Sequence, residues 1–196
     1  YGELIYLSEK LIYDKRYNHQ ENEFTLEKAT RESLHKLQTR DMIQRETQKL
    51  KMFKETEKLK LALLGTGIGG SGGSLSGRAV YTEEEIRHYR EKEPDTPLIL
   101  IRPDSVPDDV GIILLVEGLL TAKGGSTSHA AVTIPQLDKV GVVGFNKLSV
   151  YETKGYSTVD GRTIRGGDFI SIDGWSGAVY QGRHEEEAQE SNRVTL

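Results

Sequence analysis

The chain has 196 residues, with 26 Lys and Arg against 30 Asp and Glu, a formal net charge of -4. This balance argues against a general nucleic-acid binder, which needs a basic face to neutralise phosphates. The absence of cysteine excludes disulfides, thiolate metal sites and cysteine nucleophiles. No apolar run reaches the roughly 18 residues that span a bilayer, and the start at Tyr1 carries no secretion-signal pattern. We therefore expect a piece of a longer cytoplasmic protein.

Composition divides the chain near Gly65. Residues 1–64 hold one glycine and no proline, whereas residues 65–196 hold the other 20 glycines and all five prolines. Such a shift marks a change of architecture. We therefore expect a helical arm or linker over 1–64, a globular domain over 65–182, and a polar tail or linker over 183–196.

The arm is expected to be helical because its apolar residues recur at helical spacing. Leu4, Ile5, Leu7, Leu11 and Ile12 fall on one helical face. Such an arm packs on a neighbouring domain or offers a surface to a partner, and an oligomer is compatible with either role.

The second part reads as α/β. Apolar runs predict strands at 98–101 and 140–143, and 83–90 has a helical composition. Residues 111–120 fit either a strand or a helix followed by a strand. Beyond position 156, turn residues separate short apolar segments, which predicts hairpins. The turn signals are Asp160-Gly161, Gly166-Gly167 and Asp173-Gly174.

Two glycine motifs resemble nucleotide or nucleophile sites but lack the required context. Residues 65–70 satisfy G-x-G-x-x-G and residues 69–73 satisfy G-x-S-x-G. Both motifs need a preceding strand, and here a charged helical pattern precedes them. No Gly-Lys-Ser/Thr follows, which excludes a P-loop. We favour a flexible linker for this stretch.

A third motif, GGSTSHAAV at 124–132, is different because it surrounds one histidine with small residues and hydroxyls. Gly124 and Gly125 allow the backbone to turn tightly and an anion to approach. A hydroxyl at 126–128 can cap a helix that begins near His129. A neutral imidazole at that positive helix end can act as a nucleophile and accept a phosphoryl group.

The simpler interpretation of His129 is an ordinary half-buried histidine, because the other four histidines offer it no partner by spacing. A metal site has no support, since no two histidines lie within helical or hairpin reach of each other.

The same segment resembles the phosphohistidine signature G-G-x-T-S-H-A-A of the phosphoenolpyruvate-utilising enzymes. This family includes pyruvate, phosphate dikinase, phosphoenolpyruvate synthase and enzyme I of the sugar phosphotransferase system, and the Thr-Ser-His-Ala-Ala form is most similar to the dikinase. Weaker matches flank it in order: GTGIGGSGGSLSGRAV at 65–80, LILIRPDSVPDD at 98–109, GLLT at 118–121 and GGDFISIDGWSGAVYQG at 166–182.

The resemblance implies a swivelling β/β/α domain that carries a phosphoryl group. His129 matches the histidine that is phosphorylated on Nε2. Gly124, Gly125 and Ser128 match positions beside the phosphoryl group. Thr127 matches the threonine that is a regulatory phosphorylation site in plant dikinases and also lies in the phosphoryl-binding motif.

The partners implied by the resemblance are two other domains of the same enzyme. An ATP-binding domain, which holds ATP and magnesium, would supply the phosphoryl group, and a barrel domain would handle phosphoenolpyruvate and pyruvate. The domain itself is expected to bind no cofactor and to complete no reaction alone. An enzyme I-like phosphocarrier role is the alternative within this class.

Three positions depart from the family pattern. Pro135 stands where an arginine is expected, Asp138 where a glycine is expected, and Gly72 where a proline is expected. An arginine would contact a transferring phosphate bidentately, and proline cannot. Pro135 should also shorten or kink the helix. A second hypothesis is therefore a catalytically silent docking or regulatory module of the same fold.

Overall fold

The structure, a computed structural model, describes residues 35, 39–40 and 51–188. The chain divides into two units, residues 1–46 and 47–196, and the fold below belongs to the second. Residues 35, 39 and 40 are helical, while the remainder of the arm expected over 1–50 lies outside the described residues.

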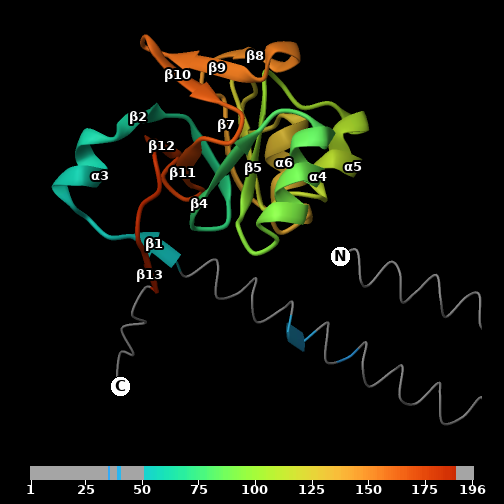
Figure 1. The fold of residues 1–196 in the computed structure, drawn as a ribbon, viewed down its shortest axis with the longest axis horizontal. Helices are drawn as coiled ribbons and strands as arrows, with labels where there is room; N and C mark the ends of the chain where they lie inside the picture. Colours follow the sequence, from blue (N-terminus) through green and yellow to red (C-terminus); the bar gives the residue numbers. More distant parts are fainter. Residues whose placement is uncertain (1–34, 36–38, 41–50, 189–196) are drawn as a thin grey trace, which may run out of the picture. The chain divides into compact units, whose positions relative to one another are not determined.

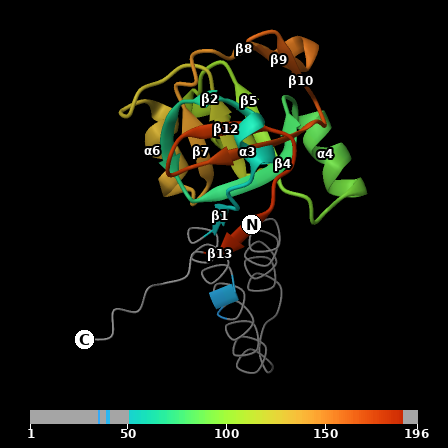
Figure 2. The ribbon, with the colours of Figure 1, turned by 90° about the vertical axis from the view of Figure 1, so that its left-hand side faces the viewer.

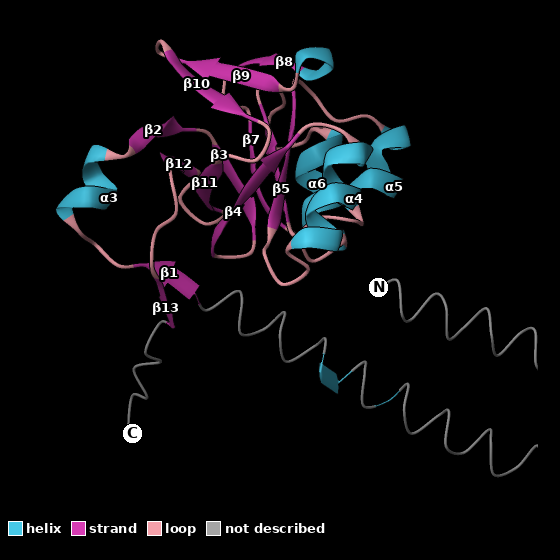
Figure 3. Cartoon of the chain, in the orientation of Figure 1, coloured by secondary structure: helices cyan, strands magenta, loops and turns pink. Residues whose placement is uncertain are grey.

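Four parallel strands form the centre of an eight-stranded sheet, and helices connect them (Figures 1 and 3). Strand β4 pairs with β5, β5 with β6, and β6 with β7. The strands expected at 98–101 and 140–143 are confirmed, and 111–120 contains a helix followed by a strand. In chain order the elements are β4 (Ser74–Val80), α4 (Glu83–Lys92), β5 (Leu98–Arg102), η1 (Pro107–Asp109), α5 (Val110–Ile113), β6 (Gly118–Thr121), α6 (His129–Gln136) and β7 (Val140–Val143).

Further strands, all antiparallel to their neighbours, flank this centre on both sides, and the two outermost strands follow one another in the chain. These strands are β11 (Phe169–Asp173), β12 (Ala178–Gln181), β2 (Leu63–Thr66) and β3 (Ile68–Ser71), in the order β2-β12-β11-β4-β5-β6-β7-β3. The edge strands β2 and β3 are separated only by Gly67, so the sheet curls round and its ends meet at this residue. Such closure leaves few unpaired edge groups.

Helices α4, α5 and α6 cover one face of the central strands (Figure 1). Residues 98–101 are fully buried, as expected for a parallel strand with both faces covered. Ile86, Ile113 and Ile134 bring one buried side chain from each helix to this layer. Helix α4 begins where Thr82 accepts the amide of Glu85 at 3.2 Å.

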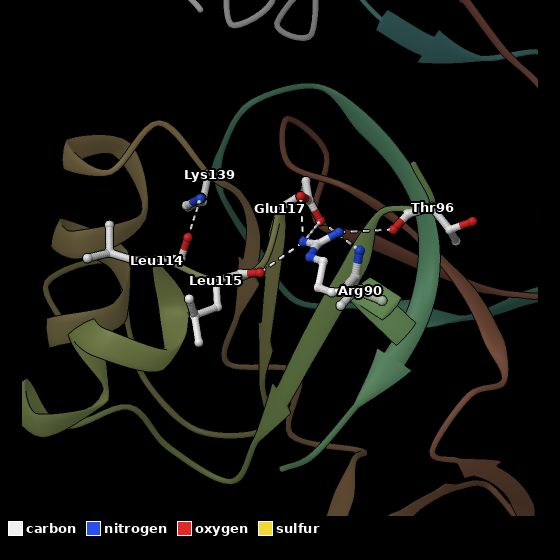
Figure 4. A network of polar contacts seen from close by, with 7 residues as sticks. Arg90, Thr96, Leu114, Leu115, Glu117 and Lys139 are labelled. Atoms are coloured by element: carbon white, nitrogen blue, oxygen red, sulfur yellow. Dashed lines mark hydrogen bonds and ion pairs between the residues drawn. The ribbon is translucent and has the colours of Figure 1, made fainter. Parts of the chain in front are cut away.

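A network of polar contacts joins α4 to the amino ends of the strands (Figure 4). Arg90 donates to both carboxylate oxygens of Glu117, at 2.7 and 2.9 Å, and to the carbonyl of Leu115 at 2.8 Å. Glu117 also accepts the amide of Leu98 at 2.8 Å. The ion pair of Arg90 with Glu117 therefore holds α4 at the sheet end opposite the loop that carries His129.

A small antiparallel sheet with the order β10-β9-β8 packs at one end of the main sheet (Figure 1). Its strands are β8 (Ser149–Tyr151), β9 (Tyr156–Val159) and β10 (Arg162–Arg165), and η2 (Glu152–Lys154) connects the first two. The hairpin expected at Asp160-Gly161 is confirmed between β9 and β10, and the turn expected at Asp173-Gly174 is confirmed between β11 and β12. Val159 and Ile164 are buried in the core under this sheet.

Tyr81 ties the small sheet to the main one. Its side chain is fully buried, and its hydroxyl donates to the carbonyl of Ile164 at 2.8 Å and lies 2.7 Å from Ser157 Oγ. The pKa of the Tyr81 hydroxyl is raised above its ordinary value, mainly because burial disfavours the charged phenolate.

We predict that Tyr81→Phe lowers the free energy of unfolding by about 1–3 kcal/mol, because the partners of the lost hydroxyl stay buried. Wild-type stability should also fall as pH rises above about 10, since unfolded tyrosine ionises there while the folded side chain resists ionisation. The phenylalanine variant should show a weaker alkaline decline. Urea denaturation of both proteins between neutral and alkaline pH measures this, and parallel curves would contradict the prediction.

The first and last strands of the described residues 51–188 run side by side as β1 (Lys51–Phe53) and β13 (Glu186–Ala188), which pair antiparallel (Figure 2). Before β13, His184 is buried, and its amide donates to Ser76 Oγ at 3.2 Å. Residues 183–188 are therefore part of the fold, which differs from the tail expected over 183–196. Residues 189–196 lie outside the described residues.

The boundary expected near Gly65 falls inside β2, and Leu64 is buried in the core. Before it, residues 51–64 contain a strand and the short helix α3 (Glu57–Leu61), so only part of this stretch is helical as expected. Leu64 is buried with residues from strands that lie far along the chain. Composition alone cannot reveal such contacts.

The expected linker at 65–73 is also replaced by strands. A Cβ on Gly69 would come within 2.6 Å of the carbonyl oxygen of Trp175, and one on Gly67 within 2.8 Å of that of Val143. These glycines therefore allow close backbone approach rather than flexibility. Gly72 adopts φ of +100°, a conformation that the proline of the family pattern could not adopt.

Candidate functional site

The loop that carries the histidine motif leaves the sheet at the carboxyl ends of the parallel strands. Thr121, the last residue of β6, lies in register with Arg102, the last residue of β5. The amide of Ala122 donates to the carbonyl of Arg102 at 3.1 Å, and that of Lys123 to Pro103 at 2.8 Å. The loop therefore begins at the carboxyl ends of the parallel strands, where α/β folds commonly bind their ligands.

A second set of bonds fixes the loop to the end of β7. The amide of Gly144 donates to the carbonyl of Lys123 at 3.2 Å, and that of Phe145 to Thr121 at 3.0 Å. The Thr121 hydroxyl donates to the Lys123 carbonyl at 2.7 Å. Sequence reasoning missed Thr121 and Gly144, because their role depends on β6 and β7 being neighbours.

The two glycines of the motif differ in what the fold requires of them. Gly124 has φ of +108°, and a Cβ there would lie 2.9 Å from Ser128 Oγ. Gly125 has open space around its Cα, with no atom within 4 Å of an added Cβ. The turn therefore needs glycine at 124, whereas position 125 is left open to solvent.

Ser128 caps α6, as one of the three hydroxyls was expected to do. Its backbone is extended, and its Oγ accepts the amide of Ala131 at 3.3 Å. Its own amide donates to the carbonyl of Gly125 at 3.0 Å, which closes the loop onto the helix start. His129 is consequently the first residue of α6, at the positive end of the helix.

Several amides around His129 have no acceptor within the described part of the chain. They belong to Ser126, Thr127, His129 and Ala130. The first two residues are exposed, and His129 is half-buried. Unpaired amides at a helix start are suited to hold an anion. The structure thus brings Gly124, Gly125, Thr127, Ser128 and His129 together in one short loop and cap.

Within the described part of the chain, the imidazole of His129 has one polar side-chain contact, which the sequence analysis did not single out. Thr133, one turn later on α6, places its Oγ1 3.4 Å from Nδ1 and 3.3 Å from Nε2. Thr133 is buried, with 6% of its surface exposed. The signal that could have found it is the spacing of four residues, which puts two helical side chains on one face.

The two departures after the histidine have visible structural consequences. Pro135 lies inside α6, which ends one residue later at Gln136, so the helix is short as predicted. Proline has no amide to donate to the carbonyl of Ala131. Asp138 has φ of +52°, the left-handed conformation that suits the expected glycine and that aspartate tolerates better than most residues.

Positive charge near the motif comes from the loop rather than from α6. Lys123 directly precedes Gly124, and its side chain is exposed. Arg102, although at the same sheet edge, is committed to Glu152 at 2.8 Å and to the Tyr81 carbonyl at 3.3 Å. The loop therefore offers an anion beside His129 its backbone amides, and Lys123 is the basic residue of the loop.

The described residues lack two other features. Over 35, 39–40 and 51–188 there is no group of three or more His, Asp or Glu side chains arranged to hold a metal ion. Among the same residues no helix is long and apolar enough to cross a membrane.

Comparison with known proteins gives a consistent set of matches. Residues 94–177 match the family described as PEP-utilising enzyme, mobile domain. The chain is 36% identical over 126 residues to the pyruvate, phosphate dikinase of Rickettsia typhi, and the match covers 63% of this chain and 14% of that protein. It is 32% identical over 130 residues to the Clostridium symbiosum enzyme, with 66% and 14% covered. For the chloroplastic dikinase 1 of Arabidopsis thaliana the identity is 36% over 117 residues, with 60% and 12% covered. The chain thus spans about one seventh of these relatives.

Proposed function

We propose that the chain is a phosphocarrier domain, because residues 94–177 match the mobile domain of the phosphoenolpyruvate-utilising enzymes and the chain is similar to part of pyruvate, phosphate dikinase. In this proposal His129 receives a phosphoryl group from an ATP-binding domain and passes it to a domain that handles phosphoenolpyruvate and pyruvate. A phosphoenolpyruvate synthase-like or enzyme I-like parent would use the same histidine with other partners.

The observation that carries the proposal is the position of His129 at the start of α6, among amides without acceptors. A half-buried imidazole there is open to solvent in part, and the helix start favours negative charge beside it. The amides of Ser126, Thr127 and Ala130 would take the phosphoryl oxygens, and Gly125 leaves room for them.

The proposed transfer step conserves atoms and charge. The lone pair of Nε2 attacks phosphorus, a nitrogen–phosphorus bond forms, and the bond from phosphorus to the donor oxygen breaks with its electrons leaving on that oxygen. The ring retains its proton on Nδ1 and becomes cationic. ATP and magnesium would be held by the partner domain, since the residues around His129 offer amides and hydroxyls rather than clustered carboxylates.

Thr127 would have two roles under this proposal. Its amide would contact the phosphoryl group, and its exposed hydroxyl would, by the resemblance to the family signature, be the counterpart of the regulatory phosphorylation site of plant dikinases. A phosphate on this side chain would place negative charge where the incoming phosphoryl group must go, and so oppose transfer.

Pro135 favours a second candidate, a silent docking or regulatory module. A guanidinium at this position would supply two parallel hydrogen bonds to a phosphate, and the structure has an exposed proline there instead. Lys123 offers a point charge but no bidentate contact.

A labelling experiment with the full chain distinguishes the phosphocarrier function from the docking module. We would incubate it with radiolabelled ATP, magnesium and the ATP-binding domain of a pyruvate, phosphate dikinase. The phosphocarrier proposal expects label that is lost in acid, survives base, and is located by mass spectrometry on the peptide containing His129. A chain that stays unlabelled while a dikinase phosphohistidine domain becomes labelled in parallel would favour the docking module.

A further inference from the structure

The segments around His129 carry no charged residue. Residues 61–77 and 124–137 contain no Asp, Glu, Lys or Arg, although these residue types make up 29% of the chain. The two segments meet in the fold, since Ile134 of the second packs over Gly70 of the first. Protein surfaces are normally rich in charged residues, whereas the centres of protein–protein interfaces are depleted of them. A charge-free region that reaches the surface therefore needs an explanation.

The outer side of α6 presents the imidazole together with an apolar side chain. Val132 and Gln136 lie three and seven residues after His129, so helical geometry puts all three on one side of the helix. Val132 is 49% exposed, and Gln136 is exposed as well. Ala130 and Ile134, on the opposite side, have no exposed surface. The imidazole therefore shares its side of α6 with an apolar side chain that the sheet leaves uncovered.

A second exposed apolar side chain comes from the edge strand β3. Its first residue, Ile68, is 40% exposed and pairs with Val143, the last residue of β7. Ile68 therefore lies at the carboxyl edge of the parallel strands, where the histidine loop begins. A Cβ built on Gly144 would overlap the carbonyl oxygen of Gly124 and lie 3.5 Å from Cδ1 of Ile68. The isoleucine thus adjoins the loop that carries His129.

Charged residues begin at the margins of this region. Lys123 directly precedes Gly124, Asp138 directly follows Leu137, and both charged residues are exposed. An uncharged, apolar centre with a polar margin is the arrangement found in protein–protein interfaces. The surface beside His129 therefore has the composition of a docking surface for another protein.

We propose that Val132, Ile68 and the turn at Gly124-Gly125 form a docking face for the ATP-binding domain that phosphorylates His129. The inference rests on the proposed function, in which the phosphorus of the donor has to approach Nε2 to about 3–3.5 Å. A donor held in the nucleotide pocket of another domain comes that close only when the margin of the pocket covers the surface beside the imidazole. That surface is the docking face, which makes this domain its occupant.

The absence of charge defines the chemistry of the partner surface. A charged side chain of the partner, buried against Val132 or Ile68, would lose its hydration without gaining an ion pair. We therefore expect the margin of the nucleotide pocket to be uncharged and apolar where it meets the docking face. A second copy of the chain could match such a face, but it would cover His129 and exclude the donor.

The substitutions Val132→Asp and Val132→Lys test the docking face in the full chain. Each places a charge inside the interface, so both should weaken binding of the ATP-binding domain of a pyruvate, phosphate dikinase about tenfold. Leu115 is the matched control, because it is 44% exposed and lies at the opposite edge of the sheet beside Arg90 (Figure 4). The same two substitutions at Leu115 should leave binding unchanged. Calorimetric titration measures the affinities, and urea denaturation checks that each variant is folded.

The rate at which His129 becomes labelled separates docking from chemistry. With ATP, magnesium and a low concentration of the ATP-binding domain, both Val132 variants should label about tenfold more slowly than wild type. Phosphoramidate, a small donor whose phosphorus–nitrogen bond breaks to release ammonia, needs no docking face. Its rate should not fall in both variants, because charges of opposite sign act on this anion in opposite directions.

Three results would overturn the inference: an ATP-binding domain that does not bind the wild-type chain, binding that neither Val132 variant weakens, or labelling that falls equally with the protein donor and with phosphoramidate. A dimer of the chain in sedimentation that Val132→Lys dissociates would assign the face to a second copy and overturn it as well. Binding that depends on Val132 in a chain that neither donor labels would support the inference and contradict the proposed function. Normal labelling with binding that does not respond to Val132 would do the reverse.

Discussion

His129→Ala should reduce acid-labile, base-stable labelling of the chain to background. The substitution removes the only imidazole in the motif, and no serine or threonine of the loop can replace it with the same chemistry, because phosphoesters survive acid. The helix itself should persist, since alanine is a better helix former than histidine and the cap on Ser128 remains. The measurement is scintillation counting of the protein after parallel acid and base treatment.

The matched control for this substitution is His88→Ala. His88 is exposed on α4 and makes an edge contact with Tyr89, without the unpaired amides that surround His129. We expect this variant to keep full labelling. If label survived in His129→Ala, or vanished equally in both variants, the phosphoryl group would not be carried by His129.

Ile134→Ala should cost about 2–5 kcal/mol of the free energy of unfolding, the usual range for removing a fully buried isoleucine. Ile134 has no exposed surface, and its side chain packs over two glycines, Gly70 of β3 and Gly141 of β7. A Cβ on Gly141 would overlap Ile134, so the glycine creates the space that the isoleucine fills. Neither glycine has a side chain that could move into the cavity.

Val132→Ala is the control on the same helix, because 49% of Val132 is exposed. Its effect should stay within about 0.5 kcal/mol, as for most surface substitutions. Urea denaturation of both variants measures the difference, and similar losses for the two would contradict the packing described. Since α6 also presents His129, we expect the alanine at 134 to weaken labelling by loosening the helix on the sheet.

The start of α6 illustrates what a local signal can predict. A hydroxyl residue followed by a run of helix formers is enough to indicate a cap, and Ser128 occupies that position. The buried strand at 98–101 and the Asp160-Gly161 hairpin could also be predicted from the sequence. An apolar run indicates a strand and a pair of turn residues indicates a hairpin, whatever the rest of the chain does. Pro135 likewise indicated where the helix would end.

The glycine stretch at 65–73 shows the opposite case. Glycine allows both flexibility and close backbone approach, and composition cannot distinguish them. Here the backbones of Val143 and Trp175 lie against Gly67 and Gly69, so a segment that reads as a linker is a pair of strands. Residues 186–188, with the sequence Glu-Glu-Ala, form a strand that composition did not indicate, since their partner β1 lies more than a hundred residues earlier.

Local chemistry along the chain thus indicates the strands at 98–101 and 140–143, the helix at 83–90 and the capped histidine motif, since each depends on residues within a few positions of one another. The folded arrangement alone decides which of the two motif glycines is required, how Gly144 anchors the loop, and that the Thr133 hydroxyl lies beside the ring. Those features depend on distances between atoms that only packing brings together. Spacing in the sequence limits such contacts but does not select among them.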